Sequence, residues 1–269
     1  MQSAQFQAQF RHEPTHWWFV ARRKIITALI SQVLPPGRSS WIVDVGCGTG
    51  GNIGSLSARY ACTGIDQSAE AIQLARTRFP DVRFLCGDAL AAMEHLAPRT
   101  SLVLLTDVLE HVADDRAMLG GLVRAALPGT YFLVTVPADR SLWSPHDQSH
   151  GHWRRYDLPG LERVWEGLPV KTLLLSHFNA RLYPVVKLAR MLSRWRGKTA
   201  GEAGTDLKMP GALVNRILER VFQGESKVLI DLLQGKRRAG YGHGVSLIAL
   251  LRREASVGIP ALVAESAAA

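Results

Sequence analysis

Short apolar segments alternate with amphipathic segments between residues 41 and 136. Each apolar run predicts a strand, and the segments between them, in which apolar residues recur at helical spacing, predict helices. The helix predicted over 68–79 has Ser68 in the N-cap position and ends before Pro80. Because the strands are apolar almost throughout, they favour a parallel sheet with helices on both faces. The predicted strands are 41–45, 61–66, 82–88, 101–107, 131–137, 170–176 and 244–253.

The chain changes character after the fifth predicted strand. Residues 138–157 show no regular period, 158–168 predict a helix, and the residues between 180 and 236 predict two or three amphipathic helices. In the segment 211–233 the apolar residues recur on one helical face. We therefore expect a doubly wound α/β domain with a helical insertion between its last two strands. The expected segments are an N-terminal helical region (1–40), the main core (41–179), the insertion (180–240), the final strand (241–255) and a flexible tail (256–269).

Composition narrows the class of protein. With 269 residues, 47% hydrophobic content and a mean hydropathy of +0.02, the chain suits one large domain with an appended part. Three cysteines without C-x-x-C spacing argue against a disulfide framework or a zinc site and favour a reducing compartment. The polar N-terminus lacks the apolar centre of a signal peptide, and no apolar run reaches about 18 residues. We therefore expect a cytoplasmic protein.

The first predicted strand ends in a glycine cluster, WIVDVGCGTGGN at 41–52. Gly46, Gly48 and Gly51 fit the G-x-G-x-x-G turn that binds dinucleotides. Gly46, Gly48 and Gly50 fit equally well the G-x-G-x-G loop that binds S-adenosylmethionine. Both loops rely on tight turns and on close approach of the backbone to the ligand. The glycines alone do not decide between the two cofactors.

Acidic residues at the ends of three consecutive predicted strands distinguish between the two cofactors. Asp66 ends the second strand, where a carboxylate accepts both ribose hydroxyls in either cofactor class, and Asp88 ends the third, within reach of an adenine amino group. Asp44, just before the glycines, would face pyrophosphate in a dinucleotide but pairs favourably with an ammonium group. The set predicts S-adenosylmethionine as cofactor and S-adenosylhomocysteine as product. Gln67, Ala89 and Asp107 are expected to contact the same cofactor.

The chain resembles the class I S-adenosylmethionine-dependent methyltransferases over roughly residues 12–180 and the final strand. The resemblance rests on "IVDVGCGTG", "GID", "CGDAL" and "LVLLTDVLEHV". It implies a seven-stranded Rossmann-like sheet, mostly parallel with an antiparallel last strand. "HWWFVARRKII" at 16–26 is similar to the N-terminal helix of bacterial small-molecule methyltransferases, the group that includes the ubiquinone-pathway O-methyltransferases. By that likeness 1–40 is a helical lid, and Arg22 or Arg23 reaches the methionine carboxylate.

Two stretches are expected to face the methyl acceptor. In "DVLEHV" (107–112), His111 has the side chain of a base at neutral pH. In the ubiquinone-pathway relatives a similar segment, matched here by Asp107, Glu110 and His111, has been linked to a divalent metal. The other interpretation is a structural role, in which the segment hydrogen-bonds its own loop; this role is favoured, and we expect no metal. His146 and His150, and with them His152, are further candidates for the base.

Other residues allow two interpretations each. Arg154 and Arg155 in "HWRRYD" suit an anionic acceptor, or they pair with Asp157 or lie on the surface. Trp17, Trp18 and Phe19 form a lid over the cofactor or pack in the core.

The expected activity is methyl transfer to an oxygen, nitrogen or carbon atom of a small-molecule acceptor, anionic or hydrophobic, in biosynthesis. The alternatives are an RNA methyltransferase and a variant that uses the cofactor for other chemistry. The net charge of +9 suits an anionic partner, but strand four ends in "TDVL" and no RNA-binding module is visible, so no nucleic acid is expected.

The positive charge is concentrated in the predicted insertion. Between Arg181 and Arg238, thirteen basic residues stand against five acidic ones. The insertion is therefore expected to cap the acceptor, form a homodimer interface or lie on an anionic membrane, if it does not simply pack on the domain.

Overall fold

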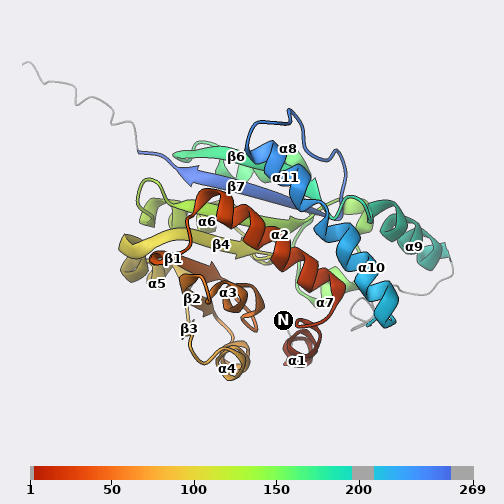
Figure 1. Cartoon of the computed structure of the whole chain (residues 1–269), viewed down its shortest axis with the longest axis horizontal. Coiled ribbons are helices and arrows are strands. Elements are labelled where there is room, and N and C mark those ends of the chain that lie inside the picture. The colour runs from red at the N-terminus through yellow and green to blue at the C-terminus, as the bar shows by residue number, and fades with distance from the viewer. Residues whose placement is uncertain (1–2, 196–208, 256–269) are drawn as a thin grey trace, which may run out of the picture.

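The computed structural model describes residues 3–195 and 209–255, and it contains one seven-stranded sheet (Figure 1). The strand order is β3-β2-β1-β4-β5-β7-β6. β1 to β5 are parallel, whereas β7 runs antiparallel to both of its neighbours. This confirms the predicted sheet. The strands are β1 Gly37–Val45, β2 Tyr60–Asp66, β3 Arg83–Cys86, β4 Thr100–Thr106, β5 Tyr131–Pro137, β6 Val170–Phe178 and β7 Ser246–Arg253.

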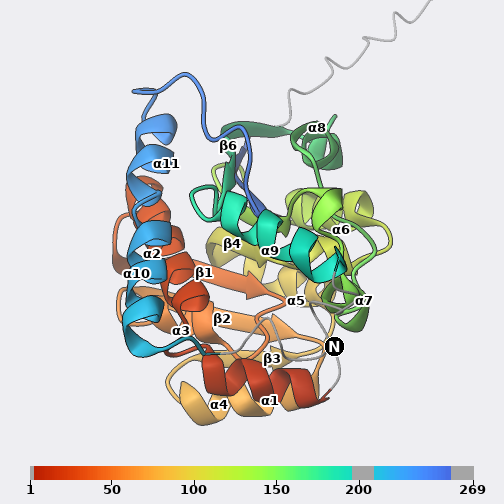
Figure 2. The same ribbon diagram turned by 90° about the vertical axis from the view of Figure 1, so that its right-hand side faces the viewer.

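Helices cover both faces of the sheet (Figure 2). Alternate residues of β1 explain this, because Ile42 lies in one apolar core and Val43 in the other. On the first face the core is completed by α2 Trp17–Val33, α3 Gly51–Leu56, α4 Ala69–Arg78, α10 Ala212–Gln223 and α11 Ser226–Leu233. On the second face it is completed by α5 Ala89–Leu96, α6 Asp115–Ala125, α8 Leu158–Glu162 and the short turn Arg163–Trp165.

Some elements differ from the sequence expectation. The third strand is shorter than 82–88, and the helix after the glycines, α3, is short, because it occupies only Gly51–Leu56. The segment 211–233 is two helices, since the chain turns at Gly224 and Glu225. The Glu225 carboxylate is buried there and accepts the backbone N–H of Arg181 at 2.9 Å, which fixes the turn. The predicted tail 256–269 lies outside the described residues.

Three further helices lie near the carboxyl ends of the parallel strands. α1 Ser3–His12 packs beside α4, and α7 Pro145–Ser149 forms within the stretch expected to be irregular (Figure 1). α9 Tyr183–Trp195 begins next to the end of β5, because the Tyr183 hydroxyl donates to Asp139 at 2.6 Å. Among the described residues, no helix is long and apolar enough to cross a membrane.

The insertion divides into two parts. α10 packs on α2, where the Asn215 side chain accepts the backbone N–H of Trp17 at 2.9 Å, and α11 packs on α2 and β6. α9 exposes an apolar row made of Val185, Leu188, Met191 and Leu192, and the outer side of α10 also exposes Leu213, Val214 and Ile217. The packing of α10 and α11 follows from their buried residues Phe222 and Leu229.

Candidate functional site

The glycine loop between β1 and α3 has a backbone that other residues adopt only with strain. Gly46, Gly48 and Gly50 have φ angles of 70°, 54° and 81°. A Cβ atom on Gly46 would come within 2.6 Å of Val108 Cγ2. The backbone N–H groups of Gly46 and Cys47 both donate to the Ile65 carbonyl oxygen, at 2.8 and 3.0 Å. The loop is therefore held against the end of β2, and its contact with a cofactor remains a prediction.

Asp66 connects this loop to the next one. Its two carboxylate oxygens accept the backbone N–H groups of Gly48 at 2.9 Å and of Ser68 at 2.8 Å. The carboxylate is part-buried at the carboxyl edge of the sheet, and each oxygen has a further lone pair for a hydroxyl donor. Its predicted ribose contact remains a prediction.

Asp88 has a structural partner. It is the N-cap of α5, and its Oδ1 accepts the Ala91 N–H at 2.9 Å. Its side chain is exposed, as is Gln67, while Ala89 is buried at the start of α5. The helix cap is thus present, and the contacts of Asp88, Gln67 and Ala89 with the adenine end of a cofactor remain predictions.

Asp44 is a buried acid without a hydrogen-bond partner. It is fully buried, and neither of its carboxylate oxygens has a partner among the described residues. Burial raises its pKa to about 8, and the positive charge of Arg22 only partly opposes this. A ligand ammonium group would supply both the missing hydrogen bonds and the missing charge.

Arg22 has a buried hydrogen-bond donor that complements the buried acceptor of Asp44. One of its terminal nitrogens lies 2.8 Å from Asp107 Oδ2 and donates to Thr135 Oγ1 at 2.9 Å, whereas its buried Nε has no partner within residues 3–195 and 209–255. Its guanidinium lies 4.8 Å from the ring centre of Trp18. Of the two arginines predicted here, Arg22 therefore points to the site, because Arg23 donates instead to the Glu13 carbonyl at 2.7 Å.

Together these groups match an amino acid. A buried acceptor without a donor (Asp44) and a buried donor without an acceptor (Arg22 Nε) suit an ammonium and a carboxylate respectively. Asp107, held by Arg22 and by the Thr135 hydroxyl at 3.0 Å, adopts a left-handed backbone with φ 58°. The residues present thus fit the methionine part of S-adenosylmethionine.

The N-terminal aromatic residues and α1 border this region. Trp17 packs against Phe222 of α10, with ring centres 6.2 Å apart, and Phe19 is buried. Trp17 and Trp18 therefore both pack against the core, and Trp18 also lies against the Arg22 guanidinium. α1 lies over the loop, since a Cβ on Gly48 would be 3.4 Å from the Gln9 side chain. The lid role of 1–40 remains a proposal.

The segment after β4 carries two titratable side chains, Glu110 and His111, which the sequence predicts to face the acceptor. Glu110 is fully buried, its two carboxylate oxygens have no partner among the described residues, and burial raises its pKa well above the usual value. Burial and the neighbouring His152 lower the pKa of His111 to about 4. His111 is therefore neutral at neutral pH and offers a nitrogen lone pair.

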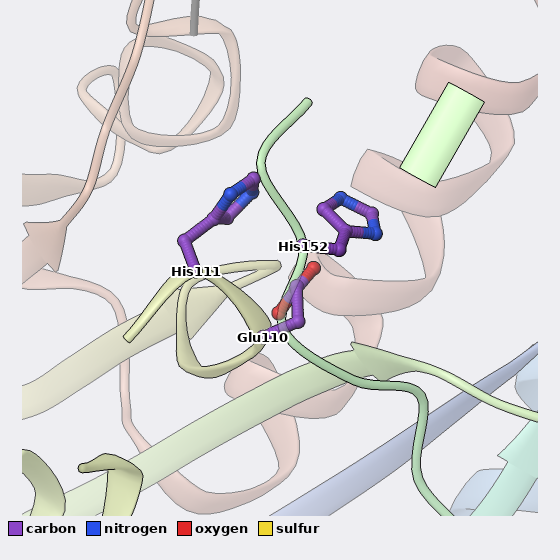
Figure 3. A group of neighbouring side chains, drawn as sticks. All are labelled: Glu110, His111 and His152. Carbon is purple, nitrogen blue, oxygen red and sulfur yellow. The ribbon is translucent and has the colours of Figure 1, made fainter. Parts of the chain in front are cut away.

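His152 joins these two residues from the stretch after β5. The rings of His111 and His152 meet edge to face with centres 4.7 Å apart. Ligand atoms of Glu110, His111 and His152 all lie within 4.8 Å of one another, and Figure 3 shows the Glu110 carboxylate between the two imidazoles. This is the group among the described residues that a metal ion could use.

The other predicted histidines lie beside this group. His146 and His150 stack with ring centres 3.9 Å apart, and His150 Nδ1 lies 2.9 Å from the His146 carbonyl oxygen. His150 is 6.1 Å from His152, measured between ring centres. The structure thus brings His111, His146 and His150 together in one region, and the role of each as a base remains a prediction.

The two arginines of "HWRRYD" are engaged in ion pairs. Arg155 is buried and donates to both oxygens of Asp147 at 2.8 and 3.1 Å, and Arg154 donates to Asp115 at 2.9 Å. The expected pairing with Asp157 is wrong, because Asp157 caps α8 through Gly160 N. Their other expected role, binding an anionic acceptor, would require breaking these pairs.

Sequence reasoning missed Asp147 as a site residue and gave His152 no separate role. Asp147 is fully buried and accepts His152 Nδ1 at 2.9 Å in addition to Arg155 and Ser144. The only sequence signal was a charged residue within a histidine-rich stretch, which does not identify its partners.

Known proteins resemble this chain in sequence and fold. A family model described as "Methyltransferase domain" matches residues 42–129. A trans-aconitate 2-methyltransferase of Rhizobium meliloti is 34% identical over 186 residues, which cover 62% of this chain and 70% of the relative. Another of Paracidovorax citrulli is 26% identical over 215 residues, 77% and 76% of the two chains. The solved plantazolicin methyltransferase BamL, in complex with a triazolic desmethylPZN analog and SAH, is 14% identical and superposes with a TM-score of 0.52 over 93% of this chain and 89% of its own.

Proposed function

Because the chain belongs to the class I S-adenosylmethionine-dependent methyltransferases, we propose that it methylates a small-molecule acceptor with a hydrophobic body. The enzyme class and the cofactor follow from the relatives. When bound, S-adenosylmethionine supplies an activated methyl group. The unpaired buried atoms of Asp44 and Arg22 carry the proposal for how this chain binds it.

In this proposal the protein contributes alignment and exclusion of water. Asp44 holds the ammonium and Arg22 the carboxylate of the methionine part, and Asp66 holds the ribose. Asp107 keeps Arg22 in place through the 2.8 Å ion pair. The acceptor lies against His111, His146 and His150, on the side of the site formed by the segments after β4 and β5.

Two observations support a hydrophobic rather than an anionic acceptor. Arg154 and Arg155 are occupied by Asp115 and Asp147. Trp153 is 65% exposed next to Glu110, whose carbonyl oxygen accepts its N–H, and α9 exposes Leu188 and Met191. Large apolar side chains that remain exposed in a row commonly mark a binding surface. α9 is accordingly proposed as the acceptor cap.

The test is a methylation assay with a panel of acceptors. The panel includes hydrophobic phenols, long-chain carboxylic acids, trans-aconitate and RNA, and release of S-adenosylhomocysteine is measured together with the product mass. We expect turnover with a hydrophobic acceptor, and Leu188→Glu should raise its KM at least tenfold. Leu127→Glu, an exposed residue between α6 and β5, is the matched control and should leave KM unchanged.

Two results would contradict the hydrophobic acceptor. Turnover of trans-aconitate alone would replace it with a polar tricarboxylate, and methylation of RNA alone would replace the small-molecule class. An unchanged KM in Leu188→Glu would exclude α9 as the cap.

A further inference from the structure

The resemblance to metal-linked relatives implies Asp107, Glu110 and His111 as metal ligands. In this structure the side chains that lie together are those of Glu110, His111 and His152. Asp107 is committed elsewhere, since Arg22 pairs with one of its oxygens at 2.8 Å and Thr135 donates to the other at 3.0 Å. Glu110 and His111 instead face His152, with ligand atoms of all three within 4.8 Å (Figure 3). The third donor thus comes from the stretch after β5 and not from the end of β4.

Glu110 is the strongest sign of a missing partner. It is fully buried, and both of its carboxylate oxygens lack a hydrogen bond among the described residues. A buried carboxylate in this situation is costly unless a cation or a donor meets it. The neighbouring donors do not do so, because Arg22 is bound to Asp107 and Arg155 to Asp147.

His152 is oriented as metal-binding histidines are. Its Nδ1 lies 2.9 Å from Asp147 Oδ1, and Asp147 is fixed by two bonds from Arg155 and one from Ser144 N. Since a carboxylate accepts the Nδ1 proton, the lone pair of His152 is on Nε2. A carboxylate that holds the far nitrogen of an imidazole is the usual support of a metal ligand.

We propose that Glu110, His111 and His152 bind a divalent cation of the zinc type, with Asp147 as the residue that positions His152. Two imidazoles and one carboxylate form a common three-ligand set that leaves a position open. Ligands on one zinc ion lie at most about 4.2 Å apart, twice the metal–ligand distance, so the side chains must close slightly from 4.8 Å. That the open position serves the acceptor's oxygen rests on the proposed function, whereas cation binding does not.

The test measures metal binding directly. The full-length protein is stripped with a chelator and titrated with ZnCl₂ and, separately, MgCl₂ by calorimetry, and bound zinc is counted by elemental analysis after gel filtration. We expect one zinc per chain. His152→Ala and Glu110→Gln should weaken zinc binding at least 100-fold, and Asp147→Asn about 10- to 100-fold. His95→Ala, an exposed histidine of α5, is the control and should bind zinc as the wild type does.

Asp107→Asn separates the two ligand sets. We expect it to retain zinc binding within about threefold, whereas the set implied by the resemblance requires a large loss. Binding of S-adenosylhomocysteine to His152→Ala shows that this variant is folded. Absence of zinc from the wild type, or loss in Asp107→Asn with retention in folded His152→Ala, would overturn the inference. Neither result would affect the acceptor assay, so the two proposals fail separately.

Discussion

Replacing Asp44 with asparagine should abolish cofactor binding and at the same time make the free protein more stable. Asp44 is fully buried and has no hydrogen-bond partner in the described part of the chain, and burial raises its pKa from 3.8 to about 8. The folded state therefore holds this proton more tightly than the unfolded state. Ionisation of Asp44 is therefore a cost to the folded state. The free energy of unfolding is unaffected below about pH 4, falls as the pH rises from about 4 to about 8, and carries the full cost above about pH 8. Asparagine does not ionise and avoids this cost.

The measurement is a series of thermal melts between pH 4 and 9 with and without S-adenosylhomocysteine. We expect Asp44→Asn to gain about 1–4 kcal/mol over the wild type at pH 8, with little gain at pH 4. The ligand should raise the Tm of the wild type but not of the variant. Asp81→Asn, an exposed acid before β3, serves as control. A variant that binds the ligand normally would show that Asp44 does not hold the ammonium group.

Arg22→Gln should lose both cofactor affinity and stability, for two separable reasons. The substitution removes the buried donor expected to meet the ligand carboxylate, which costs about 10- to 100-fold in affinity. It also leaves Asp107 without its 2.8 Å partner. Breaking a buried pair costs about 3–5 kcal/mol, and because the Asp107 side chain is 27% exposed we expect about 2–4 kcal/mol.

The double variant Arg22→Gln/Asp107→Asn distinguishes these effects. It should regain most of the stability, measured by urea unfolding, because no unpaired charge remains, but it should not regain affinity for S-adenosylhomocysteine. Arg23→Gln is the matched control, since Arg23 donates to the Glu13 carbonyl and not into the site. If the double variant bound the ligand like the wild type, Arg22 would be a structural residue only.

The sheet and the acidic residues at its carboxyl edge could be predicted because both depend on local patterns. Strands such as 41–45 and 101–107 are buried on both faces of a parallel sheet, so each is visible in the sequence as a nearly continuous apolar run. Parallel strands end at one edge, and this places Asp44, Asp66 and Asp88 near one another without any knowledge of the helices.

The group formed by Glu110, His152 and Asp147 could not be predicted in the same way, because it depends on contacts between distant segments. Glu110 and His152 meet across two loops, and Asp147 orients His152 only because Arg155 and Ser144 hold it. Arg154 is a second example, because it pairs with the distant Asp115 and not with Asp157, three residues away in the sequence. Such pairings follow from how the chain packs and leave no period or spacing in the sequence.

Calorimetric titration of the wild type and Asp66→Ala with S-adenosylhomocysteine and, separately, NAD tests the central claim most directly. The carboxyl edge of this sheet is assigned to an adenosyl amino acid, so the wild type should bind S-adenosylhomocysteine in the micromolar range and give no heat with NAD. Asp66→Ala should lose this binding, because Asp66 supports Gly48 and is expected to hold the ribose. Binding of NAD instead, or unchanged binding in Asp66→Ala, would contradict the assignment of the site.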